Sequence, residues 1–98
     1  MVKKIKWTKS ASKSFDKTVS YLQQEWSEKT AEKFVQKVNT FLINLIHYPE
    51  MGKVEMEEKG IRGFVLSRHT TVLYRIKNNQ IILLQFFDNR QHPDKKTK

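Results

Sequence analysis

Residues 61–88, IRGFVLSRHTTVLYRIKNNQIILLQFFD, carry the pattern that most clearly indicates the fold of this chain. Apolar, β-branched and aromatic residues fill three runs, at 61–67, 71–76 and 81–88, and short polar segments separate them. Runs of this kind between turn residues predict strands. The second separator, KNNQ at 77–80, contains two asparagines, which tolerate the positive φ of a tight turn. The segment therefore predicts an antiparallel meander, and its uniformly apolar last run predicts a central strand covered on both faces.

Two amphipathic helices are predicted before the meander. Apolar residues recur at three- and four-residue steps over about 9–26 and again over 28–47, which is the spacing of one helical face. Residues suited to capping precede each helix, and a proline follows the second (Thr8 or Ser10, Ser27 and Pro49). Because so few residues join them, we expect the helices to pack as an antiparallel hairpin.

The remaining segments complete the predicted architecture. Residues 2–7, VKKIKW, alternate and predict a short first strand, which we expect beside the strand at 81–88. Residues 49–60 hold a proline, two glycines and four acids, and predict a loop. The order β–α–α–β–β–β predicts a two-layer α+β fold, with the N-terminal helical hairpin packed on an antiparallel sheet. We expect one domain over residues 1–98, with a polar tail at 89–98.

The charge of the chain indicates the chemistry of its partner. Lys and Arg total 19 against 10 acids, for a net charge of +9. All the arginines lie in the last third of the chain (Arg62, Arg68, Arg75 and Arg90). Arginine binds phosphate and carboxylate groups bidentately, so this distribution favours a polyanionic or acidic partner over a basic surface that serves solubility alone.

Several classes of site are not expected. The chain has no cysteine and its three histidines are far apart in the sequence, so we expect no metal site and no cofactor. The glycines are scattered, which is not the pattern of a phosphate-binding loop. The N-terminus lacks the apolar run of a signal peptide, and no stretch approaches the roughly 20 apolar residues of a membrane span. We expect a cytoplasmic protein with no membrane partner.

The ordered set of segments resembles the RelE/ParE superfamily, the toxins of bacterial type II toxin–antitoxin systems. The resemblance covers about residues 3–93. It rests on an opening strand that ends in WT, the helix SASKSFDKTVSYL, the helix exit INLIHYPEMG, the strands of IRGFVLSRHTTVLYRI and the closing IILLQFFDNRQHP. It implies a RelE/ParE-like fold and a toxin that inhibits growth. It also implies a cognate antitoxin, which we expect to be acidic, to bind through an amphipathic helix and to form a hetero-oligomer with the toxin.

The resemblance implies either of two targets. Members of the RelE branch cleave mRNA in the ribosomal A site, and members of the ParE branch poison DNA gyrase. Cleavage of this kind needs no metal, but it needs a base, cations for the phosphorane and an acid. If the chain is such an endoribonuclease, the matching positions are Arg62, Arg75 and Arg90, with His92 for acid–base chemistry. We expect the three arginines to approach one phosphate.

Two departures from the nuclease pattern favour the ParE branch. The tail contains no tyrosine, which the RelE-type nucleases place at the C-terminal end. The loop before residue 61 contains Lys53 and Lys59, but its glutamates at 55, 57 and 58 would repel phosphate. We therefore expect ParE-like inhibition of gyrase, with RelE-like mRNA cleavage as the alternative. An inactive antitoxin-binding module and a general basic nucleic-acid-binding domain are further alternatives.

The arginines also have a purely structural interpretation. Arg62 and Arg75 can be residues on the solvent-facing side of a strand. They can also stabilise the fold by pairing with Asp88 or with the acids of residues 55–58. The sequence leaves these interpretations open.

Overall fold

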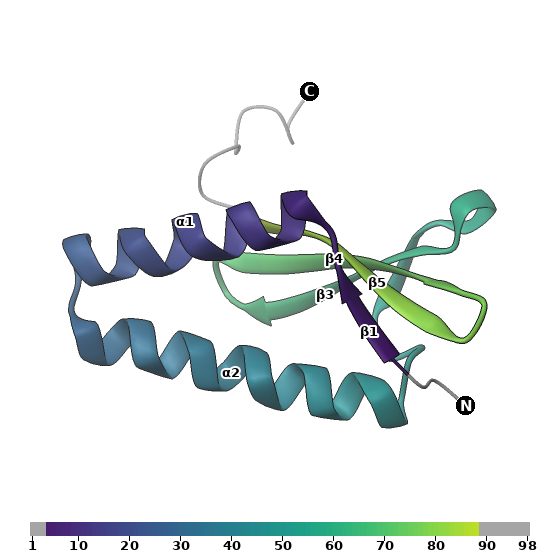
Figure 1. Ribbon diagram of the computed structural model, residues 1–98, viewed down its shortest axis with the longest axis horizontal. Helices are drawn as coiled ribbons and strands as arrows, with labels where there is room; N and C mark the ends of the chain where they lie inside the picture. Colours follow the sequence, from purple (N-terminus) through teal and green to yellow (C-terminus); the bar gives the residue numbers. More distant parts are fainter. Residues whose placement is uncertain (1–3, 89–98) are drawn as a thin grey trace.

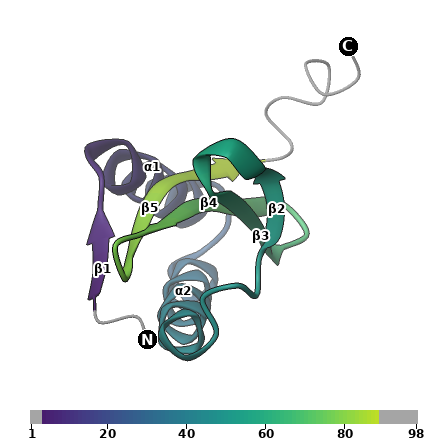
Figure 2. The ribbon, with the colours of Figure 1, turned by 90° about the vertical axis from the view of Figure 1, so that its right-hand side faces the viewer.

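The computed structural model describes residues 4–88 (Figure 1). Their elements in chain order are β1 (Lys4–Trp7), α1 (Lys9–Glu25), α2 (Glu28–His47), β2 (Lys53–Met56), the short 3-10 helix η1 (Glu57–Lys59), β3 (Ile61–Ser67), β4 (Thr70–Lys77) and β5 (Gln80–Asp88). The two helices lie side by side and cover one face of the sheet (Figures 1 and 2). The predicted two-layer α+β fold and its helical hairpin are confirmed.

The sheet has the strand order β1-β5-β4-β3-β2. β1 pairs with β5, as predicted, and this pair is parallel, whereas the other three pairs are antiparallel. The sheet is therefore mixed. β2 is a strand where the sequence predicted a loop. All four of its residues are exposed, and within the described residues it pairs with β3 alone, so its sequence, KVEM, lacks the apolar pattern of a buried strand.

The helix boundaries follow the predicted capping residues. The Thr8 hydroxyl accepts a hydrogen bond from the Ala11 backbone N–H at 3.0 Å and donates one to the Leu83 carbonyl at 2.8 Å. Thr8 therefore caps α1 and also ties its first turn to β5. Ser27 caps α2 through the N–H of Thr30. α2 ends at His47, directly before Tyr48 and Pro49.

The core lies between the helices and the sheet face that they cover. Ala11 and residues of α2 pack there with inward-facing residues of β4 and β5 (Phe34, Val38, Phe41 and Leu45; Val72, Tyr74, Ile81, Leu83 and Phe86). On the opposite face, called here the open face, Ile82 and Phe87 of β5 are only half-buried. The prediction that residues 81–88 are covered on both faces is therefore wrong, because both helices pack on the same side (Figure 2).

The turn between β4 and β5 has the predicted geometry. Asn78 and Asn79 have φ angles of 53° and 63°. Two successive residues at positive φ are typical of the type I′ turn. This turn is favoured in two-residue hairpins because its twist matches that of the two flanking strands.

Candidate functional site

Arg62 is bound to the chain's own backbone. From β3, its Nη1 donates hydrogen bonds to the carbonyl oxygens of Gly52 at 2.7 Å and Glu50 at 3.2 Å. Both carbonyls belong to the segment that follows α2. Arg62 thus stabilises the fold, although through backbone carbonyls and not through the acidic partners that the sequence suggested.

Tyr74, on the neighbouring strand β4, binds the same segment that follows α2. It lies opposite Arg62 in the β3–β4 register and is fully buried. Its hydroxyl donates to the Pro49 carbonyl at 2.7 Å and accepts from the Gly52 N–H at 2.9 Å. Burial raises the pKa of this hydroxyl above its ordinary value of 10.0, against the opposing effects of the Gly52 hydrogen bond and the Arg62 charge. The hydroxyl therefore acts as a neutral bridge.

Gly52 is required by this close contact. A Cβ at residue 52 would lie 2.7 Å from the Tyr74 hydroxyl oxygen and 2.9 Å from a ring carbon of Tyr74. Any larger residue would push the tyrosine away from the segment that it holds.

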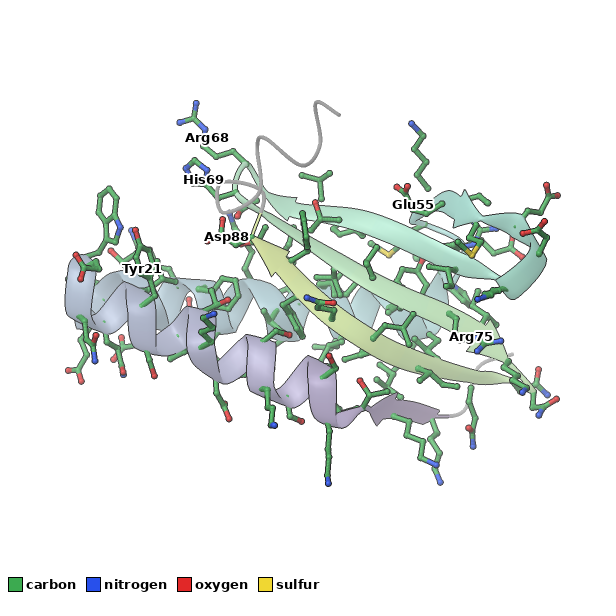
Figure 3. All side chains as sticks on the ribbon, turned by 90° about the horizontal axis from the view of Figure 1, so that it is seen from above. Tyr21, Glu55, Arg68, His69, Arg75 and Asp88 are labelled. Atoms are coloured by element: carbon green, nitrogen blue, oxygen red, sulfur yellow. The ribbon has the colours of Figure 1, made fainter. Side chains whose placement is uncertain are left out.

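Arg75 lies on the other face of the sheet. It follows Tyr74 in β4 and is in register with Ile61 and Ile82, so alternation along the strand directs it to the open face. Its Nε is buried and has no hydrogen-bond partner among residues 4–88. Figure 3 shows Arg75 at the end of the sheet opposite to Arg68 and His69.

The predicted catalytic residues are therefore not all brought together. Arg62 and Arg75 occupy opposite faces of the sheet, and the Nη1 of Arg62 binds backbone carbonyls. Arg90 and His92 lie outside the described residues. A nuclease role for these four residues stays a prediction, and this arrangement of Arg62 and Arg75 does not direct them to a single phosphate.

A groove with two cavities lies on the helix side of the molecule. A cavity of about 280 Å³, open to solvent on one side, is bordered by α1, α2 and the turn after β3, and it is lined by His69 and Asp88 among others. Figure 3 shows these two residues near Tyr21. A second cavity, of about 500 Å³, lies between α2 and β3. Lys33 and Lys37 line both cavities. The sequence does not distinguish these lysines as site residues, because a charged stripe on a helix is usually a solvent-exposed face.

Two further kinds of site are absent from the described part of the chain. Within residues 4–88, the His, Asp and Glu side chains form no group of three that could hold a metal ion. Over the same residues, neither helix combines the length and apolar content needed to span a membrane.

Solved structures of toxins share this fold. A chain of the chromosomal ParDE TA system from P. aeruginosa aligns with a TM-score of 0.71 and 23% identity, over 87% of this chain and 94% of that one. The YoeB/ParE toxin from Agrobacterium tumefaciens aligns with a TM-score of 0.65 and 16% identity, over 88% and 98%. A chain of the YoeB-YefM complex from Staphylococcus aureus gives 0.58 and 16%, over 89% and 95%. The comparison with curated proteins finds no match.

These similarities place the fold among those of ParE- and YoeB-type toxins. The family model described as "ParE toxin of type II toxin-antitoxin system, parDE" matches residues 5–93. The chain belongs to this family. The predicted membership of the RelE/ParE superfamily is confirmed.

Proposed function

We propose that this toxin inhibits DNA gyrase and is neutralised by a cognate acidic antitoxin. The observation that carries the proposal is the match to the ParE toxin family over residues 5–93. The resemblance of the sequence to the RelE/ParE superfamily implies that gyrase is the target of the ParE branch.

The placement of the arginines also favours gyrase over mRNA as the target. A nuclease must direct preorganised cations at the charge that develops on one phosphate. Arg62 and Arg75 lie on opposite faces of the sheet, and Arg62 already binds the carbonyls of Glu50 and Gly52. A toxin that acts by binding a protein target does not need these two side chains to converge.

An antitoxin partner is supported by the relatives and by charge. The similar structures include a ParDE system and a YoeB-YefM complex. With a net charge of +9, this chain attracts an acidic protein and repels a basic one. We expect the antitoxin to contribute an amphipathic helix and to form a hetero-oligomer with the toxin.

Induction of the chain in bacteria that lack the antitoxin tests the proposed function. We expect growth arrest, a DNA-damage response and intact mRNA, with growth restored when the neighbouring antitoxin gene is co-expressed. Breaks in mRNA at the ribosomal A site with normal DNA supercoiling would favour the RelE-like endoribonuclease. Full expression of soluble protein without arrest would favour an inactive antitoxin-binding module or a general nucleic-acid-binding domain.

A further inference from the structure

The open face of the sheet carries a cluster of cations at the end where β4 turns into β5. The strand register places these cations in two rows that cross β1, β5 and β4 (Lys6, Ile82 and Arg75; Lys4, Gln80 and Lys77). The row between them, formed by Ile5, Ile81 and Ile76, packs with the core. Because side chains alternate along a strand, the two outer rows share the open face. We call Lys4, Lys6, Arg75 and Lys77 the basic corner.

The basic corner is large enough to contact several phosphates at once. Neighbouring strands lie about 4.8 Å apart and residues two apart on a strand about 7 Å apart, so the four backbone positions mark a rectangle of roughly 7 by 10 Å. The side chains extend outward from this rectangle. Duplex DNA carries one negative charge per about 1.7 Å of its axis, so several phosphates lie within the span of the corner.

Arg75 is the fixed member of the basic corner. Ile61 and Ile82 flank it in register, and both are half-buried. Since its Nε is also buried, the stem of the side chain lies against the sheet (Figure 3). A guanidinium held in this way loses less conformational freedom when it binds an anion. The three lysines of the corner are exposed and supply mobile charges around it.

The charge of the sheet changes sign from one edge toward the other. Neither of the two rows that form the basic corner contains an acid. The acids Glu55, Glu57 and Glu58 belong to β2, the other edge strand, and to η1, which follows it. A polyanion on this face is therefore attracted to the side of β1 and β4 and repelled from the side of β2.

The basic corner suits a nucleic-acid backbone better than unpaired bases. Proteins that bind single strands place aromatic rings where successive bases can stack. The side chains that lie between the four cations are those of Gln80 and Ile82, and neither is aromatic. The corner thus combines charge with no stacking platform, which fits the phosphates of a duplex.

We propose that the basic corner docks on the phosphate backbone of duplex DNA. The inference rests on the proposed function, because gyrase acts on duplex DNA and brings a toxin that binds it close to that duplex. Phosphate contacts carry no sequence information, so the corner adds affinity for DNA without selecting a site. Contacts of this kind give Kd values on the order of 10⁻⁴–10⁻⁶ M at physiological salt, so the corner by itself binds weakly.

Removal of the three exposed lysines tests the proposal. The corner variant keeps the half-buried Arg75 and carries three changes (Lys4→Gln, Lys6→Gln and Lys77→Gln). The control variant carries three changes on α1, in the helical layer (Lys9→Gln, Lys13→Gln and Lys17→Gln). Each variant lowers the net charge from +9 to +6. Fluorescence anisotropy measures binding of each full-length protein to a labelled duplex of mixed sequence, and circular dichroism establishes that each is folded.

We expect the corner variant to bind the duplex about tenfold or more weakly than wild type. Each lost phosphate contact lowers the slope of log K against log salt by about one, so this slope should fall by about three. The control should lose about threefold or less, because its charges act at long range and are screened. A variant with arginine in place of the three lysines should bind as wild type does, since it keeps the charges.

Equal weakening by the corner and control variants, or no binding of wild type to the duplex, would overturn the proposal. Tighter binding to a single-stranded RNA of the same length, lost in the corner variant, would also overturn it, because the corner would then hold single-stranded RNA. A gyrase supercoiling assay tests the proposed function separately. Inhibition of gyrase without DNA binding would remove the corner and leave the function. DNA binding through the corner without inhibition would support the corner and contradict gyrase as the target.

Discussion

The hydroxyl of Tyr74 joins the sheet to the segment that follows α2. It donates a hydrogen bond to the Pro49 carbonyl and accepts one from the Gly52 N–H. Arg62 donates hydrogen bonds to two carbonyls of the same segment. A buried tyrosine of this kind contributes through its ring as well as its hydroxyl, and the hydroxyl must be satisfied. The close contact of Tyr74 with this segment also explains why residue 52 is a glycine and not a residue with a side chain.

Tyr74→Phe should destabilise the protein by about 1–3 kcal/mol, because the buried Gly52 N–H and Pro49 carbonyl lose their shared partner. Urea unfolding measures the change. Tyr48→Phe is the matched control, because Tyr48 is 67% exposed, and it should change stability by less than about 0.5 kcal/mol. Equal stability of Tyr74→Phe and wild type would contradict the role of the bridge.

The raised pKa of Tyr74 predicts a pH dependence. The folded state holds this proton more tightly than the unfolded chain, so above about pH 10 unfolding releases it and stability falls as pH rises. Below pH 10 the contribution is complete. The stability difference between wild type and Tyr74→Phe should therefore begin to shrink as the pH rises above about 10, while the titrating lysines cancel in that difference. A constant difference over this range would count against the raised pKa.

The two strand arginines should respond differently to substitution. Arg62→Met removes the donor to Glu50 and Gly52 and should destabilise the fold by about 1.5–3 kcal/mol. Arg75→Met removes a buried Nε that has no hydrogen-bond partner in the described part of the chain, so its effect should be below about 1 kcal/mol. Thermal and urea unfolding of the two variants compare them directly. A larger loss for Arg75→Met than for Arg62→Met would contradict the structural role assigned to Arg62.

The arginine positions could not have been predicted from the sequence alone. Alternation fixes which residues within one strand share a face, but the relation between two strands depends on their register. In the β3–β4 pair the register shifts between Val65 and Ser67. This irregularity lies in a segment whose sequence carries no sign of it, so the sequence did not show that Arg62 and Arg75 point in opposite directions.

At the scale of elements, strong local patterns explain what the sequence predicted correctly. The apolar stripes of α1 and α2, their caps Thr8 and Ser27, and the asparagine turn at Asn78 and Asn79 all have the expected structure. Each of these signals is local. β2 was missed because a fully exposed edge strand is specified by its pairing with β3 and not by a pattern of its own.

Asn79→Gly should stabilise the β4–β5 hairpin. Asn79 has a φ of 63°, which glycine adopts without the steric penalty of a side chain, and Asn-Gly is the preferred pair in this turn. We expect a gain of about 0.5–1 kcal/mol, measured by thermal unfolding. Asn39→Gly in the exposed middle of α2 should instead destabilise the protein by roughly 1 kcal/mol. A loss of stability for Asn79→Gly would contradict the turn assignment.

At the scale of the whole molecule, the charge and the layer arrangement define the surfaces available to partners. The net charge is +9, one sheet face is covered by helices, and a groove with Lys33 and Lys37 borders α2. The family could be recognised from the order of segments along the chain. The groove could not, because its lining comes from both helices, β3 and the segment after α2, which only the folded chain brings together.

We propose that this ParE-family toxin acts on DNA gyrase. The most direct measurement adds the purified protein to purified DNA gyrase and relaxed plasmid, and follows supercoiling and cleaved DNA. We expect dose-dependent loss of supercoiling, accumulation of gyrase-bound breaks, and reversal of both when the antitoxin is added first. Normal supercoiling without breaks at a large excess of folded toxin, together with mRNA cleavage by the same preparation on translating ribosomes, would contradict it.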